Sequence, residues 1–500
     1  MMTENPQIKT KFKSLDDLIE LRWYCILILI MAETTAFISM ANVTLMVFAG
    51  ATPTVIGCDN TTISDCHEFE SFKNASKCSN PVLEYQFESV QVEFNYICDK
   101  AKMVKNTITV QTFGIVVGAA IFGQISDSFG RRKTLIISSM GSALFNLIAS
   151  YSSNLFYFAL WRFFSGIFAG GVSVVQMVYL IENVPRYHRM WIQNTFTWSP
   201  NYIIFAYFAW LAQDWRTLLI VVSAASALSV LVLLLLEESP RWLVQKGKIE
   251  EARRLFIKIR KIDRLYSEDF EKDLDEVLRI EAEKEEDAND KKYTFIHLCC
   301  TWKMLGQTAT FLVGFICSSM TMYALLFNME KLSGSIYWNG AIIGATRWII
   351  NITVSLADYK LQWFGRKMSV TLSTVITLIC LSGIIVFMKT GNVLSIGTNL
   401  IISMCAQLFL SKYLIVNELY PTAVRNLAMS AVSTMCRVGA MFSPQLFYLS
   451  DIAEWIPYAV LIGFQFVDLL IFSLFIPETK GVHLENHLPS KHGRIFGKSD

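Results

Sequence analysis

The sequence Gly123-Gln-Ile-Ser-Asp-Ser-Phe-Gly-Arg-Arg-Lys133 joins two long stretches without a charged residue, Asn106 to Ser126 and Thr134 to Trp161. A helix needs about 20 mostly apolar residues to cross a hydrocarbon core about 30 Å thick. Both stretches are long enough, and the second exceeds one helix and contains a polar turn from Tyr151 to Asn154. The pattern therefore predicts membrane helices that reverse at short polar turns.

The remaining composition extends this pattern over the whole chain. Of 500 residues, 53% are hydrophobic and 17% are charged, and the mean hydropathy is +0.40. Additional uncharged stretches cover 190–213, 217–236, 304–329, 368–388 and 390–411. Other apolar stretches contain a single charge each, namely Glu33, Arg162, Arg347, Arg437 and Asp468. Together these features predict twelve membrane-spanning helices. The net charge of +2 gives no broad field for binding nucleic acid.

Basic residues are concentrated in alternate short loops, on the side of the basic N-terminus. They are Arg131, Arg132, Lys133, Arg186, Arg189, Arg366, Lys367 and Arg425. Loops rich in lysine and arginine stay in the cytoplasm. We therefore expect both termini to be cytoplasmic and residues 50–105 to form an extracellular loop.

The loop 50–105 carries features of an oxidising compartment. It contains four cysteines and two glycosylation acceptor sequences, at Asn60 and Asn74. The cysteines are Cys58, Cys66, Cys78 and Cys98. We expect two disulfides, and three connectivities are possible. The alternative is that some of these cysteines remain free thiols.

The spans and polar segments divide the chain into five parts. They are a cytoplasmic N-terminus (1–22), a first six-helix half (23–236), a linker (237–303), a second six-helix half (304–477) and a tail (478–500). In the linker, Ser239-Pro240 is typical of a helix start, and Ile249 to Ile262 has apolar residues at helical spacing. A solvated linker helix is favoured over a partner-binding module.

The two halves repeat one another. Glu182 has Pro185 at +3 and Arg189 at +7, and Glu418 is followed in the same way by Pro421 and Arg425. Gly130-Arg131 recurs as Gly365-Arg366, and the Glu238 segment recurs at Glu478. Parallel repeats of this kind occur in major-facilitator transporters.

The motifs also resemble a known family. The sequence from Gly123 to Lys133 is similar to the major-facilitator signature between the second and third helices. Glu238-Ser-Pro-Arg-Trp-Leu, Asn417-Glu-Leu-Tyr-Pro-Thr-Ala-Val-Arg-Asn and Ile476-Pro-Glu-Thr-Lys-Gly resemble the organic cation, anion and carnitine transporters, the solute carrier family 22. The resemblance implies an all-α membrane protein whose twelve helices form two pseudo-symmetric halves.

A cytoplasmic gate is implied by the same resemblance. Its residues would be Asp127, Arg131, Glu182, Arg189, Glu238, Glu418 and Arg425. They would close the outward-open state, whereas the alternative is that each only fixes a loop. One departure concerns the second half, in which Asp358 lies seven residues before Gly365 instead of three.

Charged residues inside the predicted spans indicate the substrate. An arginine at the centre of a membrane helix costs about 2.5–3.5 kcal/mol on insertion scales, so it is expected to face a cavity or a partner. Arg437 matches the position that is arginine in anion-transporting relatives, and Arg347 lies where relatives often carry an acid. With Tyr323, which matches a family aromatic, these residues predict a binding site for organic anions. The alternatives are pairing of the arginines with Glu33 and Asp468, or a cation or carnitine-like substrate.

Two further membrane charges have separate interpretations. Glu33 is a candidate for carrying a coupling proton. Lys412 lies near the end of the tenth span and is expected to extend its ammonium group to the membrane surface.

Other functional classes fit the sequence poorly. All six histidines lie outside the predicted spans, which argues against a metal centre at membrane depth. Gly493 to Ser499 is one residue short of a phosphate-binding loop and lacks a preceding strand. We expect no enzymatic activity, no cofactor and no nucleic-acid partner. The expected partners are a small organic ion and membrane lipid, and the expected form is a monomer at the plasma membrane. A receptor without transport is a distant alternative.

Overall fold

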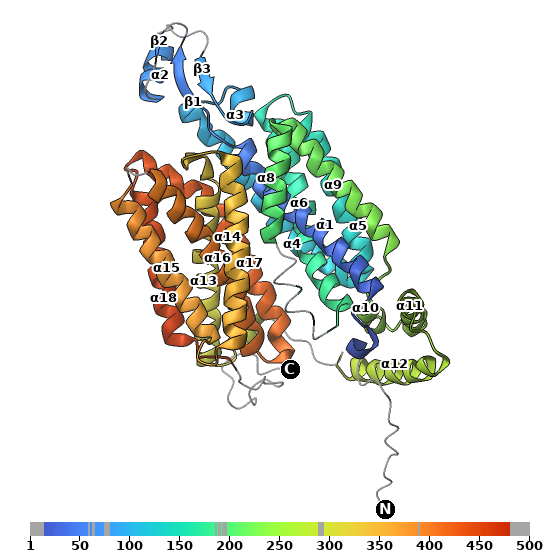
Figure 1. The fold of residues 1–500 in the computed structure, drawn as a ribbon. Coiled ribbons are helices and arrows are strands. Elements are labelled where there is room, and N and C mark those ends of the chain that lie inside the picture. Colours follow the sequence, from blue (N-terminus) through green and yellow to red (C-terminus); the bar gives the residue numbers. More distant parts are fainter. Residues whose placement is uncertain are drawn as a thin grey trace, which may run out of the picture.

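The computed structural model describes residues 15–58, 61–62, 66–74, 81–185, 188, 192, 198–288, 295–388 and 391–480. Within them, long helices form two groups of six that lie side by side in Figure 1. The N-terminal group contains α1 (Trp23–Ala49), α4 (Ala101–Phe129), α5 (Arg131–Ser150), α6 (Leu155–Asn183), α8 (Trp198–Ala212) and α9 (Trp215–Leu235). The C-terminal group contains α13 (Trp302–Leu326), α14 (Ile336–Lys360), α15 (Arg366–Val386), α16 (Gly391–Leu419), α17 (Thr422–Leu446) and α18 (Ile456–Phe475).

These helices fall on the twelve stretches that the sequence predicts. Nine helices in the described ranges are long and apolar enough to cross a membrane. The other three are α5, α8 and α17. Helix α5 packs against α6, α8 packs against α14 and α1, and α17 packs against α13 and α4. Basic residues at the start of α5 and Arg437 within α17 lower the hydropathy of those two helices. The predicted all-α membrane fold is therefore confirmed.

Local capping explains where several helices begin. Asn154 accepts a hydrogen bond from the Tyr157 amide at 3.0 Å, so the polar turn after Ser150 starts α6. Ser239 accepts from the Trp242 amide at 3.3 Å, and Pro240 is the first residue of α10 (Pro240–Gln245). Side-chain oxygens at these positions satisfy amides that have no partner inside the helix. The predicted start at Ser239-Pro240 is confirmed, and the polar turn predicted at 151–154 lies between α5 and α6.

The packing of α4 against α6 depends on glycine. A Cβ atom on Gly118 would lie 1.8 Å from the Ile167 carbonyl oxygen, and one on Gly170 would lie 2.3 Å from that of Ile115. Without these methyl groups the two backbones approach closely, as small residues allow in membrane helix pairs. The close approach fixes the position of α6 relative to α4, which packs against α17 of the second group.

A small domain lies at one end of the molecule, which we call the disulfide end. It contains β1 (Thr54–Cys58), β2 (Thr61–Thr62), α2 (Cys66–Asn74), β3 (Pro81–Glu84) and α3 (Val90–Glu93). The antiparallel strands have the order β2-β1-β3, with Val55 opposite Leu83. At the top of Figure 1 this domain stands above both groups.

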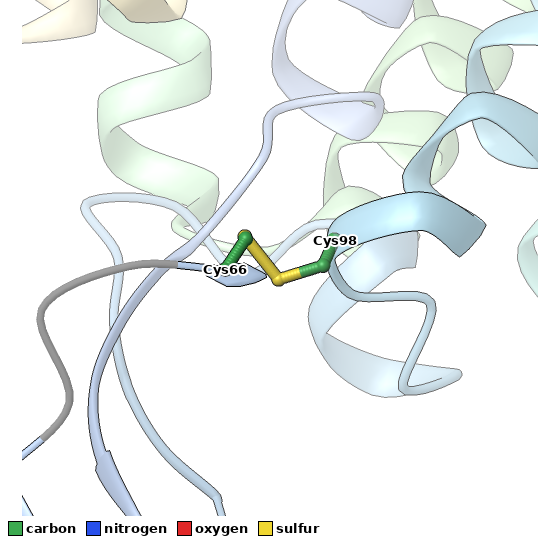
Figure 2. The surroundings of a disulfide bond; sticks show 2 residues. All are labelled: Cys66 and Cys98. Carbon is green, nitrogen blue, oxygen red and sulfur yellow. A yellow bond between two sulfur atoms is a disulfide. The ribbon is translucent and has the colours of Figure 1, made fainter. Parts of the chain in front are cut away.

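Disulfides tie this small domain together. Cys66 is bonded to Cys98, with the Cα atoms 5.6 Å apart (Figure 2). Cys58 is also disulfide-bonded. Cys78, Asn60 and the side chain of Asn74 lie outside the described residues. In the structure, Cys58, Cys66 and Cys98 therefore all take part in disulfides.

The opposite end, which we call the linker end, carries α10, α11 (Ile249–Ile262) and α12 (Glu268–Ala288). Figure 1 shows these helices beneath the N-terminal group and away from the C-terminal group. Leu255 and Phe256 of α11 share a hydrophobic core with Ile28 of α1. The Tyr24 amide donates to Asp263 at 3.0 Å, and burial raises the pKa of this carboxyl. The linker is therefore anchored to the first helix group.

Short 3-10 helices complete the described structure: η1 (Leu15–Leu18), η2 (Cys98–Lys100), η4 (Phe295–Cys299), η5 (Met329–Lys331) and η6 (Phe447–Asp451). Among them η5 and η6 follow α13 and α17 at the disulfide end. These two segments bring polar side chains of the second group close to α4.

The glycine packing gives a testable prediction. Gly118→Ala should lower the thermal unfolding temperature of the purified protein by several degrees, because the new methyl group would overlap the Ile167 carbonyl. Gly463→Ala in α18 is the matched control, since a Cβ atom there meets nothing within 4 Å. Equal unfolding temperatures for the two variants would contradict the close approach of α4 and α6.

Candidate functional site

The predicted binding residues come from three helices of the C-terminal group. Tyr323 belongs to α13, Arg347 to α14 and Arg437 to α17. Tyr323 lies within electrostatic reach of both guanidinium groups. The structure therefore brings the three predicted residues into one region.

Arg437 reaches across to the N-terminal group. Its Nη2 donates to the Ser173 hydroxyl of α6 at 3.1 Å, and its Nη1 is buried without a hydrogen-bond partner. The Ser173 hydroxyl itself donates to the Gly170 carbonyl at 2.8 Å. The guanidinium group is thus held at the interface of the two groups by a neutral acceptor. Ser173 was not predicted, because a single serine in an apolar helix gives no signal in the sequence.

Arg347 also contacts the other group, through an aromatic ring. Its Cζ lies 4.9 Å from the ring centre of Tyr202 in α8, a distance typical of a cation–π contact. The side chain is buried, and its Nε and Nη1 have no hydrogen-bond partner. Tyr202 and Phe205 of the same helix are also buried in the core.

The pairing of these arginines with Glu33 and Asp468 is wrong. Asp468 instead binds Lys412, and Glu33 lies beside the Asn201 side chain. One oxygen of Glu33, Oε2, is buried without a partner. Among the described residues, therefore, neither Arg347 nor Arg437 has a carboxylate partner.

Lys412 does not extend to the membrane surface, which corrects the sequence prediction. Its Nζ lies 2.6 Å from Asp468 Oδ2 and 3.0 Å from the Ser318 hydroxyl, and both charged side chains are only 1% exposed. A Cβ atom on Gly314 would lie 2.5 Å from Asp468 Oδ1. Gly314 on α13 leaves room for the Asp468 carboxylate of α18. Because this carboxylate is a buried partner for the Lys412 ammonium group, Lys412 does not extend to water.

A cluster of charges at the linker end joins four predicted gate residues. Arg131 Nη1 lies 2.7 Å from Asp127 and its Nη2 lies 3.3 Å from Glu182. Glu238 accepts from the Arg132 amide at 2.9 Å, at the start of α5. A Cβ atom on Gly130 would lie 2.3 Å from Glu238 Oε2, and its φ is +111°, so glycine is required there.

The C-terminal group repeats this arrangement. Arg366 pairs with Asp358 and lies 3.4 Å from Glu418. Glu478 accepts from the Arg366 and Lys367 amides at 2.8 and 3.1 Å, at the start of α15. The unusual spacing of Asp358 therefore does not disrupt the pairing. The repeated Gly-Arg motif was the sequence signal for Arg366.

Arg425, another predicted gate residue, does not join these clusters. Arg425 donates to the Tyr420 carbonyl at 3.3 Å, within its own turn. Arg189 lies outside the described residues. Each charge cluster described here is contained within one helix group.

Comparison with known proteins identifies the family. The model of the sugar (and other) transporter family matches residues 45–488. The chain belongs to this family. Curated relatives place the transporter among the solute-carrier-22-like members of the major facilitator superfamily. Its relatives and its fold are of the major-facilitator transporter type, and such proteins are not enzymes.

Two of the relatives carry different names. Solute carrier family 22 member 16 of Xenopus laevis is 27% identical and covers 83% of this chain and 74% of its own. The organic cation transporter protein of Drosophila melanogaster is 26% identical and covers 86% and 78%. Among solved structures, the inward-open xylose transporter XylE from E. coli has a TM-score of 0.64 at 16% identity. It covers 92% of this transporter and 98% of its own chain. This likeness confirms the fold.

The buried pair in the transporter's C-terminal group predicts a double-mutant effect. Lys412→Met alone should destabilise the protein by about 3 kcal/mol or more, because it leaves the Asp468 carboxylate buried without its counter-charge. Adding Asp468→Leu should recover most of the loss, since no charge then remains in the core. Thermal unfolding in detergent measures both effects. A double variant as unstable as Lys412→Met would contradict the pairing.

Proposed function

We propose that this transporter moves small organic anions by alternating access between its two helix groups. The observation that carries the proposal is Arg437, which lies at the interface of the groups with Nη1 buried and unpartnered. A guanidinium group presents two parallel N–H donors that fit a carboxylate or sulfonate. An anionic substrate would supply the counter-charge that the described residues do not.

Arg347 supports the same substrate charge. It is buried beside Tyr202, with two unpartnered nitrogens, and Asp468 is already bound to Lys412. An uncompensated cation in a low-dielectric region attracts anions strongly and repels cations. Tyr323, which lies near both arginines, offers an aromatic face for a flat organic substrate.

The linker-end charge clusters would serve as the gate of the proposed cycle. The first contains Asp127, Arg131, Glu182 and Glu238, and the second contains Asp358, Arg366, Glu418 and Glu478. In each cluster a carboxylate accepts hydrogen bonds from backbone amides at the start of one helix. These contacts hold the ends of neighbouring helices together. We propose that these ends approach one another when the disulfide end opens.

The proposed orientation places the disulfide end outside the cell and the linker end in the cytoplasm. Disulfides form on the oxidising side of a membrane, and Cys66–Cys98 lies at the first end. The basic loops at the linker end follow the positive-inside rule. A location in the plasma membrane, with the monomer as the working unit, completes the proposal.

A second candidate is an organic cation or carnitine-like zwitterion. It is favoured by Glu33, whose Oε2 is buried without a partner and could face a cationic group or carry a coupling proton. One relative is named an organic cation transporter protein. A zwitterion would engage Arg437 and Glu33 at once.

The sign of the substrate charge can be tested at Arg437. Arg437→Asp should abolish anion uptake, because it reverses the local charge. Arg437→Lys should keep weak uptake with the KM raised about tenfold, because lysine lacks the paired donors. The measurement is uptake of a panel of radiolabelled anions, cations and zwitterions into expressing cells, with surface expression quantified.

Arg347→Ala should weaken uptake of the same anions less than Arg437→Ala if it supplies electrostatic attraction without direct contact. Anion uptake by Arg437→Ala equal to that of the parent would rule out the proposed contact. Preference of the parent for cations would favour the second candidate.

The orientation gives a separate prediction. Glycosidase treatment should shift the gel band of the cell-expressed protein, because Asn60 and Asn74 would face the secretory lumen. Replacing both with Gln should abolish the shift. A parent protein that is never glycosylated, with the loop protected from reagents added outside cells, would reverse the orientation.

A further inference from the structure

The two helix groups are joined at the disulfide end by a buried ion pair. Lys105 lies near the start of α4 in the N-terminal group, and Glu330 lies in η5 of the C-terminal group. Lys105 Nζ is 2.9 Å from Glu330 Oε1 and 2.8 Å from Asn328 Oδ1. The charged side chains are 11% and 9% exposed, so little water reaches the contact.

A second ion pair between the groups lies in a different environment. Lys102 Nζ is 2.5 Å from Asp451 of η6, but these side chains are 41% and 56% exposed. Water and salt screen such a surface pair, and its net contribution is small. The chain thus offers a buried pair and an exposed pair between the same two groups, only three residues apart on α4.

Neutral contacts surround the buried pair. Gln86, from the small disulfide-bonded domain, accepts from the Ile336 amide of α14 at 2.8 Å, and Tyr337 donates to the Gln86 carbonyl at 2.7 Å. Tyr448 of η6 donates to the Asn106 side chain of α4 at 2.8 Å. The disulfide end is therefore closed by contacts from both groups, with Lys105–Glu330 as the buried charged contact among them.

We propose that Lys105 and Glu330 form the lock that closes the disulfide end and that the pair must separate in each transport cycle. The proposal rests on alternating access as the proposed function. When the groups separate, both charges enter water, which compensates for the lost contact. When they close, each charge is acceptable only because the other is present. The disulfide end therefore closes favourably only when both opposite charges, Lys105 and Glu330, are present.

A lock and an ordinary packing contact differ in which conformational state a substitution destabilises. Removing one partner leaves the other charge buried in the closed state but hydrated in the open state, so the closed state alone is destabilised. Exchanging the two residues restores opposite charges across the same interface. A residue that only stabilised the fold would affect both states and would not change the balance between them.

The test uses a cysteine reporter in the same interface. Thr109 of α4 is partly buried and accepts a hydrogen bond from Gln445 of α17, so Thr109→Cys is less accessible when the disulfide end is closed than when it is open. The full-length reporter is expressed in cells, and a membrane-impermeant maleimide is added outside. Lys105→Met or Glu330→Gln in the reporter should each raise the labelling rate at least tenfold. The exchange of Lys105→Glu with Glu330→Lys should return the rate toward that of the parent.

Lys102→Met is the matched control and should change the rate less than twofold, because its pair is already exposed. The proposal fails if the single variants label at the parental rate, or if the exchange variant labels as fast as they do. Comparable surface expression and gel-filtration profiles exclude misfolding as the cause. Labelling needs no substrate, so this result is independent of the anion assignment, which fails only in the uptake assay.

Discussion

The ion pair between Lys412 and Asp468 determines which charges inside the second helix group remain available. It is 1% exposed on both sides and takes up the acid of α18. The described groups that act on Asp468 are Lys412 and Ser318, not Arg347 or Arg437. Because a buried carboxylate is stable only with a close counter-charge, Asp468 is committed to Lys412. Arg347 and Arg437 are consequently left without an acidic partner among the described residues.

The two halves contain the same local arrangement of a carboxylate, a glycine and an arginine. In each, a carboxylate from the segment after the last helix accepts hydrogen bonds from amides at the start of the third helix, through Glu238 or Glu478. A glycine at the turn leaves room for that carboxylate, at Gly130 and Gly365. The arginine that follows then contacts two acids of its own group. These contacts join helices within each group, and the proposed motion would take place at the interface between the groups.

Much of the fold could be predicted from the sequence, because the hydrocarbon core imposes a length and a composition on each span. Polar turns and proline starts, such as those at Asn154 and Ser239-Pro240, then fixed helix boundaries. The site was predicted less completely. Arg437 and Arg347 were found because charge at mid-span is rare, but their neighbours Ser173 and Tyr202 were not assigned a role there. The partners of Lys412 and Lys105 come from helices or turns 56 and 225 residues away, and such pairings depend on helix rotation and group packing that periodicity does not encode.

A comparison with Arg162 shows why burial alone does not identify a binding arginine. Arg162 is fully buried in the N-terminal group and also has no carboxylate among its described contacts. Its Nη1 donates to Asn146 at 2.6 Å and its Nη2 to the Asn42 carbonyl at 2.8 Å, both within the same group. Amide oxygens thus solvate this cation internally, and its position need not change when the groups move. Arg437 differs because its described hydrogen bond crosses to Ser173 of the other group and one terminal nitrogen stays unpartnered. Under the proposed alternating access this contact would break in each cycle, and the unpartnered donor would couple anion binding to the motion of the two groups.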